Sequence, residues 1–100
     1  MNTMTTTEPT DPIVHNPSAS RFETRAGGEL SVADYELIDG VMWMTHTGVP
    51  SSLRGQGVAA RLVEAALAHA RAQGLRVRPS CSYVASYMRR HPETQDLLDR

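Results

Sequence analysis

Lysine is absent from the sequence, so all ten basic residues are arginines and the chain has no ε-amine. There is one cysteine, Cys81, which has no partner for a disulfide bond within the chain. Small folds without disulfide bonds are typical of reducing compartments, which favours the cytoplasm. The sequence also lacks an apolar run of the roughly 20 residues that a membrane-spanning helix needs, and a secretion signal near the N-terminus. We therefore expect a cytoplasmic protein with no membrane partner.

Charge of one sign is not in excess either. Eleven acidic residues nearly balance the ten basic ones, for a formal net charge of -1 at pH 7. Such a balance provides no overall field that would hold nucleic acid or an anionic membrane surface. No pair of histidines has metal-ligand spacing, and one cysteine cannot form a structural zinc site. We expect neither nucleic acid nor a metal, so a ligand must be recognised by a local site.

The residues that are present fit one compact domain. The chain has 100 residues, of which 40% are apolar and 21% charged, as in ordinary globular proteins. Residues 1–12 contain five threonines, two prolines and no aromatic residue, which predicts a disordered leader. We expect His15 to share the mobility of this leader. Residues 13–100 then form a single domain, as a monomer or a weak dimer.

Strand patterns fill the first half of the domain. Residues 20–47 alternate between apolar and polar side chains, with breaks at Gly27-Gly28 and Asp39-Gly40. An Asp-Gly pair between two strand patterns is a strong hairpin signal, because both positions tolerate positive φ. These residues predict a three-stranded antiparallel meander. Ile13-Val14 adds a short extended piece before a turn at Asn16-Pro17.

Helical spacing replaces alternation from Val58 onward. Apolar residues recur there every three or four positions until Gly74, which predicts an amphipathic helix with a glycine cap. Residues 75–79 predict a strand, which the connecting helix makes parallel to the last strand of the meander. A second helix is predicted from about Ser82 to Arg90, and a short last helix from Pro92. The fold class is therefore α+β.

A glycine-rich segment links the meander to the first helix. Residues without a Cβ let the backbone approach a ligand closely, and free amides at a helix N-terminus attract anions. The backbone amides there predict a phosphate-binding nest, which consists of Gly55, Gln56, Gly57, Val58 and Ala59. The alternative is a flexible connection that only turns the chain.

Two nucleotide-binding motifs fit this segment poorly. The ATP- and GTP-binding loop requires a lysine, which the chain lacks. Residues 55–60 also match a dinucleotide fingerprint with alanine at its last position. That motif requires a carboxylate about 20 residues further on, where Val77 lies between two arginines.

The run Val49–Ala59 resembles the acetyl-CoA motif of the GNAT superfamily of N-acetyltransferases. The core of that motif is arginine or glutamine, two residues, glycine, one residue, then glycine or alanine, and Arg54, Gly57 and Ala59 fill these places. The wider resemblance, to a small single-domain subgroup, covers residues 22–97. It implies a minimal GNAT-like fold whose mixed sheet splays open, with pantetheine in the gap and the loop amides on the pyrophosphate.

The resemblance also implies a reaction, the transfer of an acetyl group from acetyl-CoA to a primary amine. The acceptor is a small molecule or a protein. The chain has little room for the helices that cover the acceptor in larger members, so we expect an open acceptor side. An alternative is a catalytically silent module that binds acyl-CoA or a protein partner.

Backbone amides from Thr47 to Val49 are candidates to polarise the thioester carbonyl. His46 beside them is a candidate base, because imidazoles titrate near neutrality, and the alternative is a strand histidine that only packs in the core. Cys81 lies at the start of the second helix near Arg78, and both should lower the pKa of its thiol. The thiol has three possible roles, as an acetyl carrier, as a lining of the pantetheine channel, or as a small apolar side chain that only packs.

Tyr83 and Tyr87 share one face of the second helix, four residues apart. The resemblance implies that a tyrosine on this helix binds the cofactor and protonates the departing thiolate. Which of the two does so is left open by the spacing.

Overall fold

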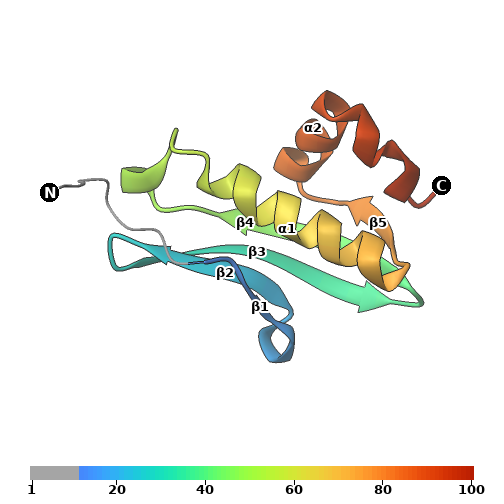
Figure 1. Cartoon of the computed structure of the whole chain (residues 1–100), viewed down its shortest axis with the longest axis horizontal. Coiled ribbons are helices and arrows are strands. Elements are labelled where there is room, and N and C mark those ends of the chain that lie inside the picture. Colours follow the sequence, from blue (N-terminus) through green and yellow to red (C-terminus); the bar gives the residue numbers. More distant parts are fainter. Residues whose placement is uncertain (1–11) are drawn as a thin grey trace, which may run out of the picture.

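A computed structural model describes residues 12–100, so the leader predicted for residues 1–12 lies, except for Pro12, outside the described part. One five-stranded sheet, with its strands in chain order, forms the base of the fold (Figure 1). Its strands are β1 (Val14–Asn16), β2 (Arg21–Ala26), β3 (Glu29–Ile38), β4 (Val41–Gly48) and β5 (Arg76–Pro79). This mixed sheet with its helices confirms the predicted α+β class.

The antiparallel part has four strands, one more than the predicted meander. The extended segment near Val14 forms β1, which pairs antiparallel with β2. Both predicted breaks are hairpin turns with positive φ, and at the second turn φ is 50° for Asp39 and 77° for Gly40. The parallel pairing of β4 with β5 is as predicted. The meander prediction was therefore right in its hairpins and short by β1.

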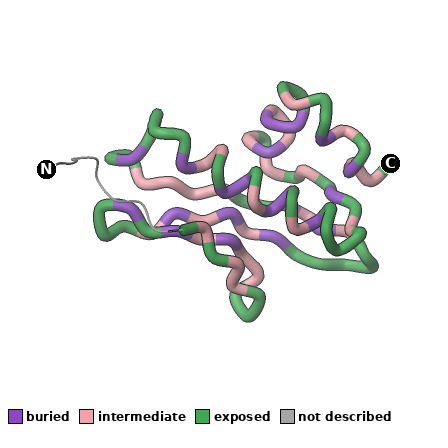
Figure 2. The backbone as a smooth tube through the Cα atoms, in the orientation of Figure 1, coloured by how far each residue is buried: buried purple, intermediate pink, exposed green. Residues whose placement is uncertain are grey.

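Two α-helices follow the meander, α1 (Val58–Gln73) and α2 (Ser82–Arg90), with bounds close to those predicted. The last predicted helix is a 3-10 helix, η4 (Pro92–Leu97). The buried face of α1 packs on the sheet, as Figure 2 shows, and consists of Val58, Leu62, Val63, Ala66, Leu67 and Ala70. No helix in the described part of the chain is long and apolar enough to span a membrane.

The sheet opens between β4 and β5. Their pairing ends where Met44 meets Pro79, and proline has no N–H to continue a ladder. The N–H of Cys81 donates the next hydrogen bond to the Met44 carbonyl, at 2.9 Å, and the chain then enters α2. The rest of β4, residues 45–48, pairs with β3 alone.

A β-bulge at Thr45 changes which way β4 points its side chains. Tyr35 of β3 pairs with Met44, but the preceding residue Asp34 pairs with His46, so Thr45 is the extra residue. Directly paired residues lie on the same face of a sheet, and a bulge shifts that alternation by one position. Thr47 therefore shares the α1 face with Met44, and His46 lies on the opposite face.

The expectation that His15 is mobile is wrong. Its ring stacks on Phe22 with centroids 4.3 Å apart, and its Nε2 lies 2.6 Å from the Tyr35 hydroxyl. The ring of His69, from α1, lies 4.4 Å away. Burial, and secondly the charge of His69, lower the pKa of His15. This aromatic cluster holds β1 against the sheet, which its short sequence pattern does not reveal.

The lowered pKa of His15 predicts a pH-dependent stability. Between the lowered pKa of His15 in the folded protein and its ordinary pKa in the unfolded chain, the unfolded chain binds more protons. The free energy of unfolding therefore falls as the pH drops through this range. We expect denaturant unfolding to show such a fall between pH 7.5 and pH 5.5. His15→Phe keeps the stacking and removes the titration, so its fall should be smaller. Equal pH dependence in both proteins would contradict the assignment.

Candidate functional site

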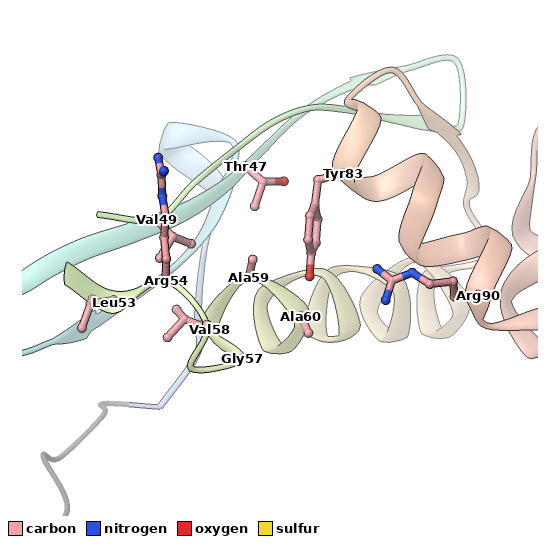
Figure 3. Close-up of a pocket in the computed structure, with 11 residues that line it drawn as sticks. Thr47, Val49, Leu53, Arg54, Gly57, Val58, Ala59, Ala60, Tyr83 and Arg90 are labelled. Atoms are coloured by element: carbon pink, nitrogen blue, oxygen red, sulfur yellow. The ribbon is translucent and has the colours of Figure 1, made fainter. Parts of the chain in front are cut away.

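A cleft of about 500 Å³ opens where β4 and β5 part. Its walls come from the end of β4, the loop before α1, the first turn of α1, and α2 (Figure 3). The lining residues are Thr47, Val49, Leu53, Arg54, Gly55, Gly57, Val58, Ala59, Ala60, Tyr83 and Arg90. The structure thus brings most of the predicted cofactor-binding residues together, and it adds Leu53, Ala60 and Arg90.

Two glycines shape the loop at the N-terminus of α1. Gly55 and Gly57 have φ of 81° and 80°, a conformation that other residues rarely adopt. Gly57 caps α1, whose first hydrogen bond runs from the Arg61 N–H to the Gly57 carbonyl, at 3.1 Å. The N–H groups of residues 58–60 consequently have no acceptor within the helix. No acidic residue lies in this first turn, so the end of α1 suits an anion.

Contacts of its own hold the loop in this shape. The Ser52 hydroxyl donates to the Glu29 carboxylate at the start of β3, at 2.6 Å. The Gln56 side-chain amide donates to the Ser52 carbonyl, at 3.3 Å. Leu53 is buried in the core. Gln56, which we predicted to bind the cofactor, is not among the residues that line the cleft, and its side chain stabilises the loop instead.

Two arginines at the cleft have no carboxylate partner in the described part of the chain, Arg54 in the loop and Arg90 on α2. Three other arginines form ion pairs, Arg21 with Glu23, Arg71 with Asp96 and Arg78 with Asp99. The Arg90 side chain extends from α2 toward the start of α1 (Figure 3). Its spacing of seven residues from Tyr83 was the available signal, because two helical turns place both side chains on one face.

The two candidate tyrosines lie in different surroundings. Tyr83 lines the cleft, and its hydroxyl points toward the first turn of α1 (Figure 3). Tyr87 is buried and stacks on His91 with ring centroids 3.9 Å apart, outside the cleft. Burial, followed by the charges of Glu64 and Glu93, raises the pKa of Tyr87. Only Tyr83 therefore faces a ligand in the cleft.

Cys81 forms the N-cap of α2, next to the cleft wall. Its Sγ lies 3.6 Å from the Oγ1 of Thr47, which lines the cleft. Burial alone would raise the pKa of the thiol, but hydrogen bonds from the Val84 backbone and the Thr47 side chain bring it below its ordinary value. Arg78 does not contribute to this lowering of the thiol pKa, contrary to expectation, because its guanidinium pairs with Asp99 and lies over Trp43.

His46 is not brought into the cleft. Its exposed side chain lies on the face of β4 opposite Thr47, as the bulge requires. The ring lies close over Gly48, where an added Cβ would be 3.0 Å from Nε2. A base at this position would meet an acceptor on the face of the sheet away from α1, and this role stays a prediction. Within residues 12–100, no three histidine, cysteine or acidic side chains form a group that could hold a metal ion.

Comparison with known proteins identifies relatives of the whole domain. The model of the GCN5-related N-acetyltransferase family matches residues 21–97. Protein NATD1 of Mus musculus is 30% identical over 88 residues, which cover 85% of this chain and 80% of the mouse protein. The Homo sapiens protein of the same name is also 30% identical, with 85% and 78% covered. The NMR solution structure of a GCN5-like protein from Staphylococcus aureus superposes with a TM-score of 0.70 at 27% identity, and covers 88% of this chain and 87% of that one.

The lowered pKa of Cys81 predicts a thiol that reacts at lower pH than a free one. We expect alkylation by iodoacetamide, followed by mass spectrometry, to have its pH midpoint below that of N-acetylcysteine amide. Thr47→Val removes a hydroxyl that donates to the thiolate, so it should move the midpoint upward. Thr45→Val, the same change two residues away on the exposed bulge, should leave it unmoved. An unchanged midpoint in Thr47→Val would show that the contact does not act on the thiol.

Proposed function

Because the chain belongs to the family of GCN5-related N-acetyltransferases, we propose that it transfers an acetyl group from acetyl-CoA to a primary amine. The observation that carries this proposal is the cleft, in which a helix N-terminus with free amides meets the open side of β4. The acceptor is a small molecule or a protein, and we propose the cytoplasm as the compartment.

The chemistry of acetyl-CoA matches the two ends of the cleft. Its pyrophosphate carries negative charge, which the amides of residues 58–60 and the guanidinium groups of Arg54 and Arg90 attract. Its pantetheine arm carries amides, which suit the backbone of residues 45–48, since these lack a partner on the β5 side. Such an arm adds to β4 as a further strand would.

Acyl transfer requires that residues around the thioester stabilise the carbonyl oxygen, deprotonate the amine and protonate the departing thiolate. A backbone amide between Thr47 and Val49 stabilises the negative charge that develops on the carbonyl oxygen. The acceptor amine attacks the carbonyl carbon after losing its proton to water or to His46. The bond from that carbon to the CoA sulfur then breaks, and the Tyr83 hydroxyl, which faces the cleft, gives a proton to the thiolate. The proton that the nitrogen loses as it becomes an amide replaces the one that Tyr83 gave.

Cys81 has two roles that the geometry allows. As a carrier, its thiolate attacks the thioester, forms an acetyl-cysteine bond and releases CoA thiolate, after which the amine attacks the new thioester. As a lining residue, it only shapes the channel and the amine attacks acetyl-CoA directly. We propose the direct route, because Cys81 is not among the residues that line the cleft, although its neighbour Thr47 is.

The alternative function is a binding module that holds acyl-CoA and transfers nothing. It uses the same loop and the same arginines, so binding does not distinguish it from the enzyme. Release of CoA thiol in the presence of a panel of primary amines distinguishes the two, because only the enzyme turns over.

The loop prediction concerns Gly57→Asp. The new carboxylate would face the pyrophosphate from the cap of α1, so we expect CoA binding to weaken by at least about 2 kcal/mol. Isothermal titration calorimetry with CoA measures the change. Gly57→Ala, measured alongside it, gives the cost of a side chain at φ 80° without the charge.

Gly28→Asp is the matched control, because Gly28 has φ of 78° and lies in the β2–β3 hairpin, away from the cleft. It introduces the same charge and the same strain, and its affinity for CoA should stay at the wild-type value. Thermal unfolding of each variant tests that the fold is retained. If Gly57→Asp and Gly28→Asp bound CoA equally well, the anion site would lie elsewhere.

The route of transfer predicts the fate of Cys81. With direct transfer, incubation with acetyl-CoA and no acceptor should leave the protein mass unchanged, and Cys81→Ala should retain much of kcat. A carrier would instead gain one acetyl group, labile to hydroxylamine and absent in Cys81→Ala, with ping-pong kinetics. The chain has no lysine, so apart from the N-terminus no amine of its own confuses the mass measurement. Detection of the labile adduct would overturn the direct route.

A further inference from the structure

Gly48, the last residue of β4, differs from the other glycines of the chain. The chain has seven glycines, and all of them lie within the described residues. Six have positive φ, a backbone conformation that side chains disfavour, whereas Gly48 does not. A side chain at Gly48 would therefore meet no such backbone strain, and a strand usually gains from having one. The reason for a glycine here lies in the space around it.

The ring of His46 fills that space. A Cβ added to Gly48 would lie 3.0 Å from the Nε2 and 3.7 Å from the Cδ2 of His46, and 3.6 Å from the Cγ2 of Val32. Non-bonded carbon contacts are most favourable at about 3.5 to 4.0 Å, so the first contact is too short. A Cβ on any of the other six glycines would meet nothing within 4 Å. Gly48 is thus the one glycine whose replacement would displace a neighbouring side chain.

The His46 ring has no other tie within residues 12–100. Its side chain is exposed, and it forms no hydrogen bond, ion pair or ring contact with another described residue. Asp34 lies opposite it on β3 but does not hold the ring by an ion pair. The missing Cβ at residue 48 is therefore what lets the ring lie close over the end of β4.

This position adjoins the backbone that the proposed reaction uses. The amides from Thr47 to Val49 are those that we propose for the carbonyl oxygen of the thioester, and Gly48 lies between them. Residues 45–48 have no strand partner on the β5 side. An amine on the sheet face opposite α1 can therefore reach a thioester held at this edge of β4. The Nε2 of His46 lies on that same face, beside the point of attack.

We propose that Gly48 is a positioning residue for acetyl transfer, since the space beside it lets the His46 ring lie where Nε2 meets the acceptor amine. Nε2 takes one proton from the ammonium form of the acceptor, which leaves a neutral amine to attack the thioester carbon. The acceptor consequently enters from the sheet face opposite α1, and acetyl-CoA binds from the α1 face. This inference rests on the proposed function, with His46 in place of water as the base.

A cycle of the variants Gly48→Ala and His46→Ala tests the proposal, with release of CoA thiol measured for the most active amine of the panel. In Gly48→Ala the new methyl group displaces the ring, so we expect kcat to fall about tenfold. The KM for acetyl-CoA should change less than about twofold, because the methyl group points to the His46 face and away from the cleft. His46→Ala should lower kcat at least about 100-fold, as loss of a general base does.

The double variant separates positioning from a general effect on the strand. Once His46→Ala has removed the ring, Gly48→Ala has nothing to displace, so the double variant should match His46→Ala in kcat within about twofold. A purely structural role of Gly48 would instead lower kcat by the same factor on both backgrounds. Gly28→Ala, a glycine replacement in the β2–β3 hairpin away from the cleft, should keep the wild-type kcat.

Nuclear Overhauser effects test the geometry without any reaction. The wild type should show them between the ring protons of His46 and the Hα protons of Gly48, since the ring lies over this residue. Thermal unfolding of Gly48→Ala should stay close to that of the wild type, because an exposed ring can move aside. A large loss of kcat with little loss of stability is the expected combination.

The outcomes separate this inference from the proposed function. A wild-type protein that binds CoA and releases no CoA thiol with any amine would overturn the proposed function, and this inference with it. With an active wild type, unchanged kcat in Gly48→Ala or in His46→Ala would overturn the inference alone. An equal loss from Gly48→Ala on both backgrounds, or no Overhauser effect between His46 and Gly48, would do the same.

Discussion

Beyond Met44, β4 has a hydrogen-bonded neighbour on one side only. Pro79 cannot continue the β4–β5 ladder, and the Cys81 N–H donates to the carbonyl of Met44, the last residue of β4 that pairs with β5. The cleft exists because these strands part at that point, and the Thr45 bulge then points Thr47 toward α1. Without the early end of β5, the backbone of residues 45–48 would be paired within the sheet. A ligand would then have no strand edge to bind.

Helix α2 borders both the cleft and a smaller hollow of about 180 Å³, which it shares with α1 and η4. Tyr83 and Arg90 line the cleft where β4 and β5 part, and Tyr87 between them lines the smaller hollow. Their surroundings have opposite charge. Within residues 12–100, the guanidinium groups of Arg54 and Arg90 at the cleft and the carboxylates of Glu64 and Glu93 at the hollow form no ion pair. One nine-residue helix thus borders surroundings of opposite charge on the surface that it shares with α1.

The hairpins, α1 and the glycine loop were predictable from the sequence, because local rules govern them. Asp39-Gly40 demands a tight turn, and the spacing of apolar residues from Val58 admits only a helix. The Thr45 bulge was not predictable, since one extra residue in a strand leaves no mark on composition. That bulge separated His46 from the cleft. The sequence likewise did not reveal that β1 is a well-packed strand, because its packing depends on ring contacts of His15 with residues from three other elements.

The loop before α1 is shaped before any ligand arrives, through the contacts of Ser52 with Glu29 and Gln56. The conformational entropy lost in ordering it is consequently a cost of folding and not of binding. Two residues that line no part of the cleft, Glu29 and Ser52, therefore keep the loop in a single shape, which would favour the anion binding that we propose there.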